Sequence, residues 1–419
     1  MPRVCLVTPS HPTSNPRLVK EADALLAAGY EVHVVAGRYF PPLDAFDAEL
    51  YSRVKWKRTV VDYTGGPRAL LGKLNRRLVR LRLANGCETS LSLATAAHHS
   101  AISALATAAA QTRADLYIGH CLAGLAAAGL AATRTGGQLG FDAEDFHPAE
   151  THEAEADPVE INSIRRIEAE FLPRCRHLTA ASPLIGQAYV DRYNLNRKPV
   201  TVLNTFPLIE APAQPIPPER PGGLPLLYWF SQTIGPNRGI EPLVAVLARM
   251  HTPCALRLRG LPANGFPDHL RQLARDAGFA GPIEFAELGA PDQMIALAAG
   301  ADLGLSLEQI NPHNRDCCLT NKIFTYLAAG VPVALTPTSA QLALSLELGA
   351  AALPLDLLRP LEAAAALDHL LTNPRKLEAA RTAAWQAGRT RFHWGYDCPQ
   401  LLASVAHALL PPHTSSSCV

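Results

Sequence analysis

Arg238 is the first residue whose type and position could bind a phosphate group. It lies in segment 231–239, which follows an apolar run and precedes a predicted helix, and Gly235 and Gly239 would let the backbone approach a ligand closely. A helix N-terminus favours an anion, and a guanidinium can hold a phosphate through two hydrogen bonds. The glycines do not form the Gly-x-Gly-x-x-Gly pattern of dinucleotide-binding folds. The segment predicts a phosphate contact at Arg238; the alternative is a surface turn with a solvated arginine.

Lys322 is a second cation placed at a helix start. Asn321 precedes it and is a good N-cap residue, so Lys322 should lie in the first turn of the helix. The helix dipole disfavours a cation there unless an anion is bound. Together with Arg238, Lys322 would neutralise a diphosphate and stabilise it as a leaving group. The alternative is an exposed lysine at the start of a helix.

Polar side chains also follow two predicted strands of the first half. His120 ends the strand 115–120, and Asp142, Glu144 and Asp145 follow the end of the next strand. A neutral histidine could accept the proton of a hydroxyl group, and a carboxylate could orient or deprotonate the same group. These residues are the candidate catalytic groups; the alternative for His120 is a structural histidine at a strand end.

Asn15 and Arg17 lie in the long loop that follows the first predicted strand. In a parallel sheet this loop reaches the edge at which ligands bind, so Arg17 could meet an anionic ligand. The alternative is a packing or capping role at the start of the next helix. No metal site is expected, because His147 and His152 have the wrong spacing for one helix face and Pro148 interrupts them.

The composition limits the class of protein. The chain has 419 residues, of which 48% are hydrophobic and 18% charged, with a formal net charge of +1. This length suggests two domains, and the apolar content excludes general disorder. A general nucleic-acid binder would need a basic excess that this chain lacks. No apolar run reaches the roughly 18 residues of a membrane span. The nine scattered cysteines without a CxxC pair predict reduced thiols in the cytoplasm.

Short apolar runs alternate with helical stretches along both halves of the chain, which predicts parallel sheets built from βαβ units. Five prolines between Pro212 and Pro221 predict an extended linker. We therefore expect an α/β protein with two doubly wound Rossmann-like domains facing a central cleft. The expected bounds are 1–206 for the N-terminal domain, 207–224 for the Pro-rich linker, 225–390 for the C-terminal domain, and 391–419 for a C-terminal helix and tail.

Two segments of the second half resemble the donor-binding domain of glycosyltransferase family 4, whose members have the GT-B fold. Residues 228–241 read YWFSQTIGPNRGIE, and residues 319–333 read LTNKIFTYLAAGVPV, close to the family's Asn-Lys-hydrophobic-Phe-Glu-Tyr-hydrophobic-Ala-Ala-Gly-hydrophobic-Pro-Val stretch. The first half resembles the family's acceptor domain more loosely, through residues 11–29, 31–36 and 141–145.

The resemblance implies a cytoplasmic glycosyltransferase of glycan or glycoconjugate biosynthesis. Residues 1–206 would then be its acceptor-binding domain and residues 225–390 its donor-binding domain, and the C-terminal helix within 391–419 would cross back toward the first domain. It would move a sugar from a nucleoside diphosphate sugar to the hydroxyl of a glycan, lipid-linked or small-molecule acceptor. It implies retention at the anomeric carbon, no metal, and no cofactor beyond the nucleotide-sugar co-substrate. The candidates are then catalytic His120, Asp142, Glu144 and Asp145; donor-binding Gly235, Arg238, Gly239, Glu308, Asn321, Lys322 and Thr325; and acceptor-binding Asn15 and Arg17.

The sequence departs from the family's pattern at two acids. Thr325 stands where members usually carry a glutamate that holds the nucleotide ribose, and Cys317 stands at a second acidic position. A threonine cannot accept hydrogen bonds from two hydroxyls as a carboxylate can. Glu308, at the end of a predicted strand, is a possible substitute. The outcomes are weaker donor binding, an altered donor or lost catalysis, so a non-catalytic GT-B binding or scaffold protein and a nucleotide-sugar epimerase remain as alternatives.

The near-zero net charge conceals two oppositely charged segments. Residues 53–82 contain ten basic residues and one acid, and residues 141–170 contain ten acids and two arginines. Leucines at spacings of three and four within 67–83 predict a basic amphipathic helix. One reading is a peripheral contact with the anionic inner face of a membrane. The other is an ordinary helix packed by its leucine face with its arginines in solvent.

Overall fold

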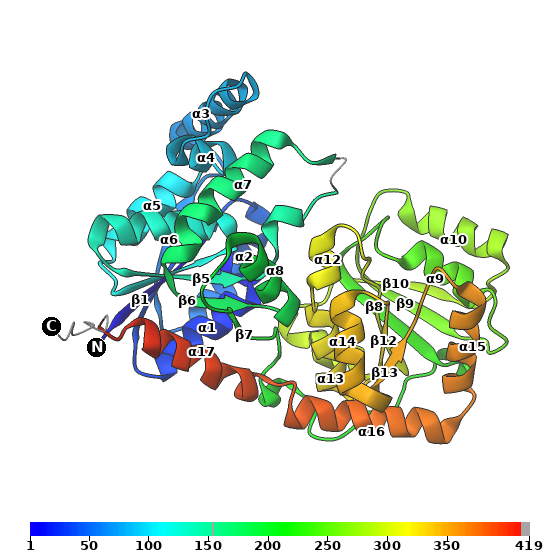
Figure 1. Cartoon of the computed structure of the whole chain (residues 1–419). Coiled ribbons are helices and arrows are strands. Elements are labelled where there is room, and N and C mark those ends of the chain that lie inside the picture. Colours follow the sequence, from blue (N-terminus) through cyan, green and yellow to red (C-terminus); the bar gives the residue numbers. More distant parts are fainter. Residues whose placement is uncertain (153–154, 412–419) are drawn as a thin grey trace. The chain divides into compact units, whose positions relative to one another are not determined.

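The computed structural model describes residues 1–152 and 155–411. The chain forms two compact units: unit 1 comprises Met1–Val202 and the chain from Cys398 onward, and unit 2 comprises Leu203–Asp397. Each unit has one sheet of parallel strands joined by helices (Figure 1). The expectation of two doubly wound α/β domains is confirmed.

The sheet of unit 1 has the strand order β3-β2-β1-β4-β5-β6-β7. All its strands are parallel, and the order in which the chain adds strands to the sheet reverses between β1 and β4. Residues Val4 to Val7 of β1 are completely buried, as expected for a central strand covered on both faces. The strands are β1 (Arg3–Thr8), β2 (Glu31–Arg38), β3 (Lys57–Asp62), β4 (Leu116–His120), β5 (Gln138–Ala143), β6 (Cys175–Ala180) and β7 (Val200–Thr201). The helices are α1 (Pro16–Ala27), α2 (Asp44–Arg53), α3 (Gly66–Ala84), α4 (Leu91–His98), α5 (Ile102–Gln111), α6 (Cys121–Thr135), α7 (Pro158–Phe171), α8 (Pro183–Tyr193) and α17 (Trp394–Ala408), whose first turn belongs to unit 2.

The sheet of unit 2 has the order β10-β9-β8-β11-β12-β13. Trp229, Leu256 and Leu305 are among the buried residues that form its core. The strands are β8 (Leu226–Ile234), β9 (Ala255–Pro262), β10 (Ile283–Ala286), β11 (Leu303–Ser306), β12 (Val333–Leu335) and β13 (Ala352–Pro354). The helices are α9 (Ile240–Leu247), α10 (Phe266–Ala277), α11 (Met294–Ala299), α12 (His313–Cys317), α13 (Asn321–Ala329), α14 (Ser339–Leu348), α15 (Pro360–Leu371) and α16 (Pro374–Thr390).

The structure differs from the sequence expectations in several elements. The alanine-rich sequence of residues 88–111 predicts one continuous helix, but these residues form two helices, α4 and α5, because the chain is extended at His99 between them. Helices α2, α12 and α14 and strand β13 were not expected. Their sequences are short or lack strong periodicity, and packing against neighbouring elements determines them.

The proline-rich segment is fixed against unit 2 by hydrogen bonds. The backbone N–H of Glu219 donates to the carbonyl of Gly300, and Arg220 donates to the buried carboxylate of Asp302 at 2.8 Å. Arg381 of α16 donates to the carbonyl of Ile216 at 2.6 Å. These contacts hold the segment in place, and its only regular elements are the short 3-10 helices Leu208–Glu210 and Pro221–Gly223.

Within the described ranges, no helix combines the length and the apolar character needed to cross a membrane.

Candidate functional site

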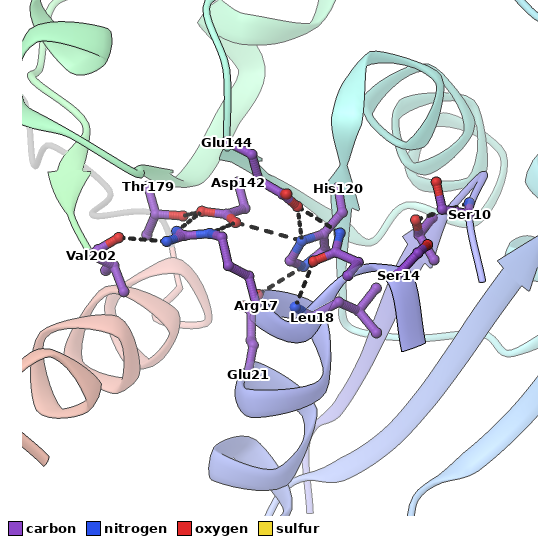
Figure 2. A network of polar contacts seen from close by, with 12 residues as sticks. Ser10, Ser14, Arg17, Leu18, Glu21, His120, Asp142, Glu144, Thr179 and Val202 are labelled. Atoms are coloured by element: carbon purple, nitrogen blue, oxygen red, sulfur yellow. Dashed lines mark hydrogen bonds and ion pairs between the residues drawn. The ribbon is translucent and has the colours of Figure 1, made fainter. Parts of the chain in front are cut away.

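Parallel pairing aligns three polar residues at the carboxyl ends of the strands of unit 1. His120 of β4 is the register partner of Asp142 of β5, and Asp142 is the register partner of Thr179 of β6. The three side chains join a network with residues of α1 (Figure 2). Ligands of doubly wound sheets bind at this edge. The structure therefore brings together the predicted His120 and Asp142.

Arg17 of α1 does not point toward open solvent, as an anion-binding role would require. Its Nε and Nη2 donate to the two carboxylate oxygens of Asp142 at 2.8 and 2.7 Å, and its Nη1 donates to the carbonyl of Val202 at 2.7 Å. Both side chains are buried. Thr179 donates a further hydrogen bond to Asp142 at 2.5 Å. Burial alone would raise the pKa of Asp142, but Arg17, His120 and Thr179 outweigh it and hold that pKa well below its ordinary value.

His120 is not the accessible neutral histidine that the sequence led us to expect. The side chain is completely buried. Its Nε2 lies 2.9 Å from Glu21 of α1, and its Nδ1 lies 3.1 Å from Glu144. Burial would lower the pKa of His120, but hydrogen bonds to Glu144 and Glu21 and the charge of Asp142 raise it to about 10. The ring is therefore an imidazolium at neutral pH and donates to both carboxylates.

Glu144 is the member of this network that reaches solvent, with 21% of its side chain exposed. The side-chain amide of Asn15 donates to it at 2.6 Å, while the amide oxygen of Asn15 accepts from the N–H of Leu18 and caps α1. Two donors thus orient one carboxylate at the strand edge. Asp145, the next residue, is partly buried.

The network does not suit a metal ion, although His120, Asp142 and Glu144 offer ligand atoms within 4.8 Å of one another. A protonated imidazole cannot bind a metal, and the guanidinium of Arg17 occupies both oxygens of Asp142. A metal would have to displace one cation and deprotonate another.

In unit 2, Glu308 and Lys322 form an ion pair of 3.0 Å just beyond the end of β11. Both side chains are mostly buried. The Nζ of Lys322 also lies 5.8 Å from the ring centroid of Trp229. Burial would raise the pKa of Glu308, but Lys322, Arg315 and Arg238 together hold it below its ordinary value. A lysine in the first turn of a helix was expected to need a nearby anion. For Lys322 in α13, the carboxylate of Glu308 is such an anion.

Arg238 and Arg315 add two further positive charges around Glu308. Arg315 of α12 donates to the carbonyl of Asn237, which ties α12 to the loop between β8 and α9. Gly239 ends this loop with a φ of 77°, and a Cβ there would lie 2.7 Å from the carbonyl oxygen of Leu307. Glycine is therefore required for the loop to approach the end of β11. Three cations and one carboxylate leave a local net charge of +2, which suits a diphosphate.

Three predicted donor-binding residues remain: Thr325 and Gly235 are buried, and Asn321 is not the N-cap residue that the sequence predicts. The N-cap of α13 is Thr320, one residue before the expected Asn321, and Lys322 lies in the first turn as predicted. Thr325 is buried and its hydroxyl donates to the carbonyl of Asn321 at 3.0 Å. Gly235 is buried, and a Cβ there would lie 3.4 Å from the Cβ of Ala263.

Sequence reasoning missed Arg315, Glu21 and Thr179. Arg315 lies between the two segments that resemble the family, 228–241 and 319–333. It comes near Glu308 only because α12 packs against the loop after β8. Glu21 is a carboxylate on the same helix as Arg17, four residues later, so its helical spacing was an available signal. Thr179 carries no charge, and only strand register reveals it.

The fold matches that of solved GT-B glycosyltransferases over nearly the whole chain. HepE of Anabaena, solved with UDP and glucose, has a TM-score of 0.68 and 15% identity, covering 97% of this chain and 100% of that one. A glycosyltransferase of Rickettsia africae ESF-5 has a TM-score of 0.69 and 13% identity, covering 97% of this chain and 98% of that one. Sucrose-phosphate synthase of Thermosynechococcus elongatus has a TM-score of 0.68 and 14% identity, covering 97% of this chain and 98% of that one.

No protein-family model matches the sequence, and no curated protein matches it. The GT-B fold is thus confirmed, while membership of glycosyltransferase family 4 stays a prediction.

Proposed function

We propose that this protein is a glycosyltransferase that moves a sugar from a nucleoside diphosphate sugar to an acceptor hydroxyl. The observation that carries the proposal is the cluster of Arg238, Arg315 and Lys322 around Glu308, at the carboxyl ends of β8 and β11. In a doubly wound sheet this is where a nucleotide binds. The solved structures with UDP, UDP and glucose, or UDP-glucose bound to HepE support the same ligand class.

In the proposed reaction, the cations of unit 2 bind the diphosphate and stabilise the charge that grows on it as the sugar departs. Glu308 is proposed to accept hydrogen bonds from the nucleoside ribose through its second oxygen, in place of the acid absent at Thr325. Gly239 lets the loop backbone approach the phosphates.

In unit 1, we assign the acceptor hydroxyl to Glu144, because it is the partly exposed carboxylate of the network. Asn15 and His120 hold its orientation, and Arg17 keeps Asp142 ionised beneath it. The pKa of about 10 makes His120 a donor at neutral pH, so its proposed role is to position Glu144 and not to accept a proton.

The finer parts of the proposal are retention of the anomeric configuration, transfer without a metal, and kinship with glycosyltransferase family 4. Retention rests on the resemblance of residues 319–333 to that family. Independence from metal rests on the three cations, which supply the charge that a metal would otherwise give the diphosphate, and on the poor fit of the unit 1 network to an ion.

The test is a thermal-shift panel of UDP, GDP, ADP and dTDP, followed by assays of hydrolysis and transfer with the matching nucleotide-sugars in the presence of EDTA. We expect one nucleotide to raise the melting temperature and its sugar conjugate to be turned over. Isomerisation of the sugar without transfer would indicate an epimerase.

A non-catalytic binding protein is the second candidate. The hydroxyl of Thr325 is engaged by the helix backbone and Cys317 is a buried thiol, so neither replaces the family's acids. Nucleotide binding without turnover of any nucleotide-sugar, or no binding at all, would favour this candidate.

A further inference from the structure

Helix α3 leaves its leucine face open to solvent. Five leucines are between 49% and 69% exposed: Leu70, Leu71, Leu74, Leu78 and Leu81. At 3.6 residues per turn they occupy an arc of about 100° along the helix. The helix packs on α4 through another face, where Val79 and Leu83 form a buried cluster with Ala97 of α4. The reading of α3 as a helix packed by its leucine face is therefore wrong.

The charges of α3 border the leucine face. Its sequence contains six basic residues and no acid: Arg68, Lys73, Arg76, Arg77, Arg80 and Arg82. At about 100° per residue, Lys73 and Arg77 follow one edge of the leucine arc and Arg82 follows the other. Arg80 is neutralised by Asp157, the N-cap residue of α7, and by Glu160 in the first turn of that helix. Across residues 1–152 and 155–411, Lys73, Arg77 and Arg82 form no ion pair.

A basic hollow of about 580 Å³ lies along the Lys73 side of α3. Its walls include four cations and one acid, together with Tyr63 and His99; the charged residues are Lys73, Arg76, Arg77, Arg80 and Asp157. The rings of Tyr63 and His99 lie 5.3 Å apart, and Tyr63 stacks on the exposed Tyr39 at 6.3 Å. The hollow offers cationic groups and amphipathic rings beside the apolar face, a combination typical of a bilayer interface.

The occupant must bring apolar surface and negative charge together. A second copy of this chain would bring the same basic helix, so a symmetric contact would oppose like charges. An anionic bilayer supplies both requirements: acyl chains for the leucines, and phosphate headgroups for the flanking cations and the hollow. Figure 1 shows α3 standing out from the sheet of unit 1, above α4 in the view.

We propose that α3 docks this protein on an anionic phospholipid surface, with the five leucines inserted among the acyl chains and Lys73, Arg77 and Arg82 on lipid phosphates. This contact goes beyond sugar transfer. Its test needs no donor or acceptor, so it stands or falls separately from the proposed activity.

The experiment is co-sedimentation of the full chain with vesicles of phosphatidylcholine alone or of phosphatidylcholine and phosphatidylglycerol in equal parts. We expect binding to the anionic vesicles, weakened at least tenfold by 0.5 M salt at about a 4 Å Debye length. The variant Leu74→Gln/Leu78→Gln should weaken binding about tenfold or more, because glutamine keeps the helix but not the apolar face. The variant Lys73→Gln/Arg77→Gln should weaken it by about tenfold as well.

Matched controls come from the same chain. Leu346→Gln/Leu361→Gln changes two leucines that are 87% and 72% exposed in unit 2. Arg165→Gln/Lys198→Gln removes two exposed charges of unit 1 outside α3. Both controls should bind as the unchanged protein does.

Equal binding to neutral and anionic vesicles, or unchanged binding by both α3 variants, would overturn the proposal. So would a dimer in solution that Leu74→Gln/Leu78→Gln converts to a monomer, since the leucine face would then be a contact between copies. If the leucine variant fails to fold by circular dichroism, the charge variant and the salt dependence decide.

Discussion

The guanidinium of Arg17 donates to both carboxylate oxygens of Asp142, although 125 residues separate them in the chain. Both groups are buried, and each has further partners in the same unit, Val202 for Arg17 and Thr179 for Asp142. The pair fixes the first turns of α1 against the end of β5. Asn15, two residues before Arg17, is thereby held within reach of Glu144.

Replacing Asp142 by asparagine should strongly destabilise unit 1. The substitution leaves the charge of Arg17 buried without its counter-ion, and breaking a buried pair in this way costs about 3–5 kcal/mol. Urea unfolding measures the loss. Glu31→Gln, which breaks the exposed pair with Arg3, should cost less than about 1 kcal/mol. Equal losses for the two variants would contradict the importance assigned to the Arg17 pair.

The stability of the protein should fall as the pH rises from about 6.5 to 10. Folding raises the pKa of His120 from 6.5 to about 10, so its stabilisation is complete below pH 6.5 and is lost as the pH passes through 10. His147, whose pKa is raised to about 9, acts in the same direction. Urea unfolding between pH 6 and 10 should therefore give a flatter profile for His120→Gln than for the unchanged protein. A profile of the same slope would show that His120 is neutral in the folded state.

Removing Arg315 should weaken nucleotide binding about 10- to 100-fold, which is the usual effect of losing a hydrogen bond to a charged group. Lys322→Ala should do the same, but it also leaves Glu308 without its ion pair, so Arg315→Ala is the cleaner variant. Isothermal titration with the nucleotide that gives the largest thermal shift measures both. Arg375→Ala, at an exposed position of unit 2, is the control. Unchanged nucleotide affinity in the Arg315 and Lys322 variants would mean that the diphosphate does not bind at this cluster.

Glu308→Gln should weaken the binding of a nucleoside diphosphate but not that of inorganic pyrophosphate. If its carboxylate holds the ribose, the variant should bind the nucleotide about tenfold more weakly, through loss of a hydrogen bond to a charged group. Pyrophosphate, which has no ribose, should bind equally well or better, because a negative charge has gone. Titration of both ligands measures this. Tighter binding of both would mean that Glu308 serves only as the counter-ion of Lys322.

Gly239→Ala should destabilise unit 2 more than Gly265→Ala. Both glycines have a left-handed backbone, with φ of 77° and 73°, so both substitutions introduce backbone strain of about 1 kcal/mol. Only at position 239 would the new methyl group also meet the carbonyl of Leu307 at 2.7 Å, whereas position 265 has open space. Thermal unfolding compares the two. Similar melting temperatures would mean that the loop after β8 shifts freely away from β11.

The sequence alone determined the alternation of strands and helices, and with it the two doubly wound sheets. Runs such as Val4 to Val7 are apolar on both faces, and Gly330 ends the helix before β12; these are local signals. The positions of His120 and Asp142 at strand ends were predictable for the same reason. The prediction of one helix over 88–111 was wrong. The alanines of this stretch favour a helix throughout, whereas the break at His99 depends on contacts with neighbouring elements.

Tertiary structure decided what the candidate residues touch. Burial of His120 follows from the packing of α1, which brings Glu21 to its ring, and no local pattern encodes that contact. Likewise, the spacing of the leucines in α3 is the same whether that face is covered or open. A periodic pattern fixes which side chains share a face, but the free energy of each side chain depends on which element, solvent or charge lies opposite. Only the folded chain supplies that partner.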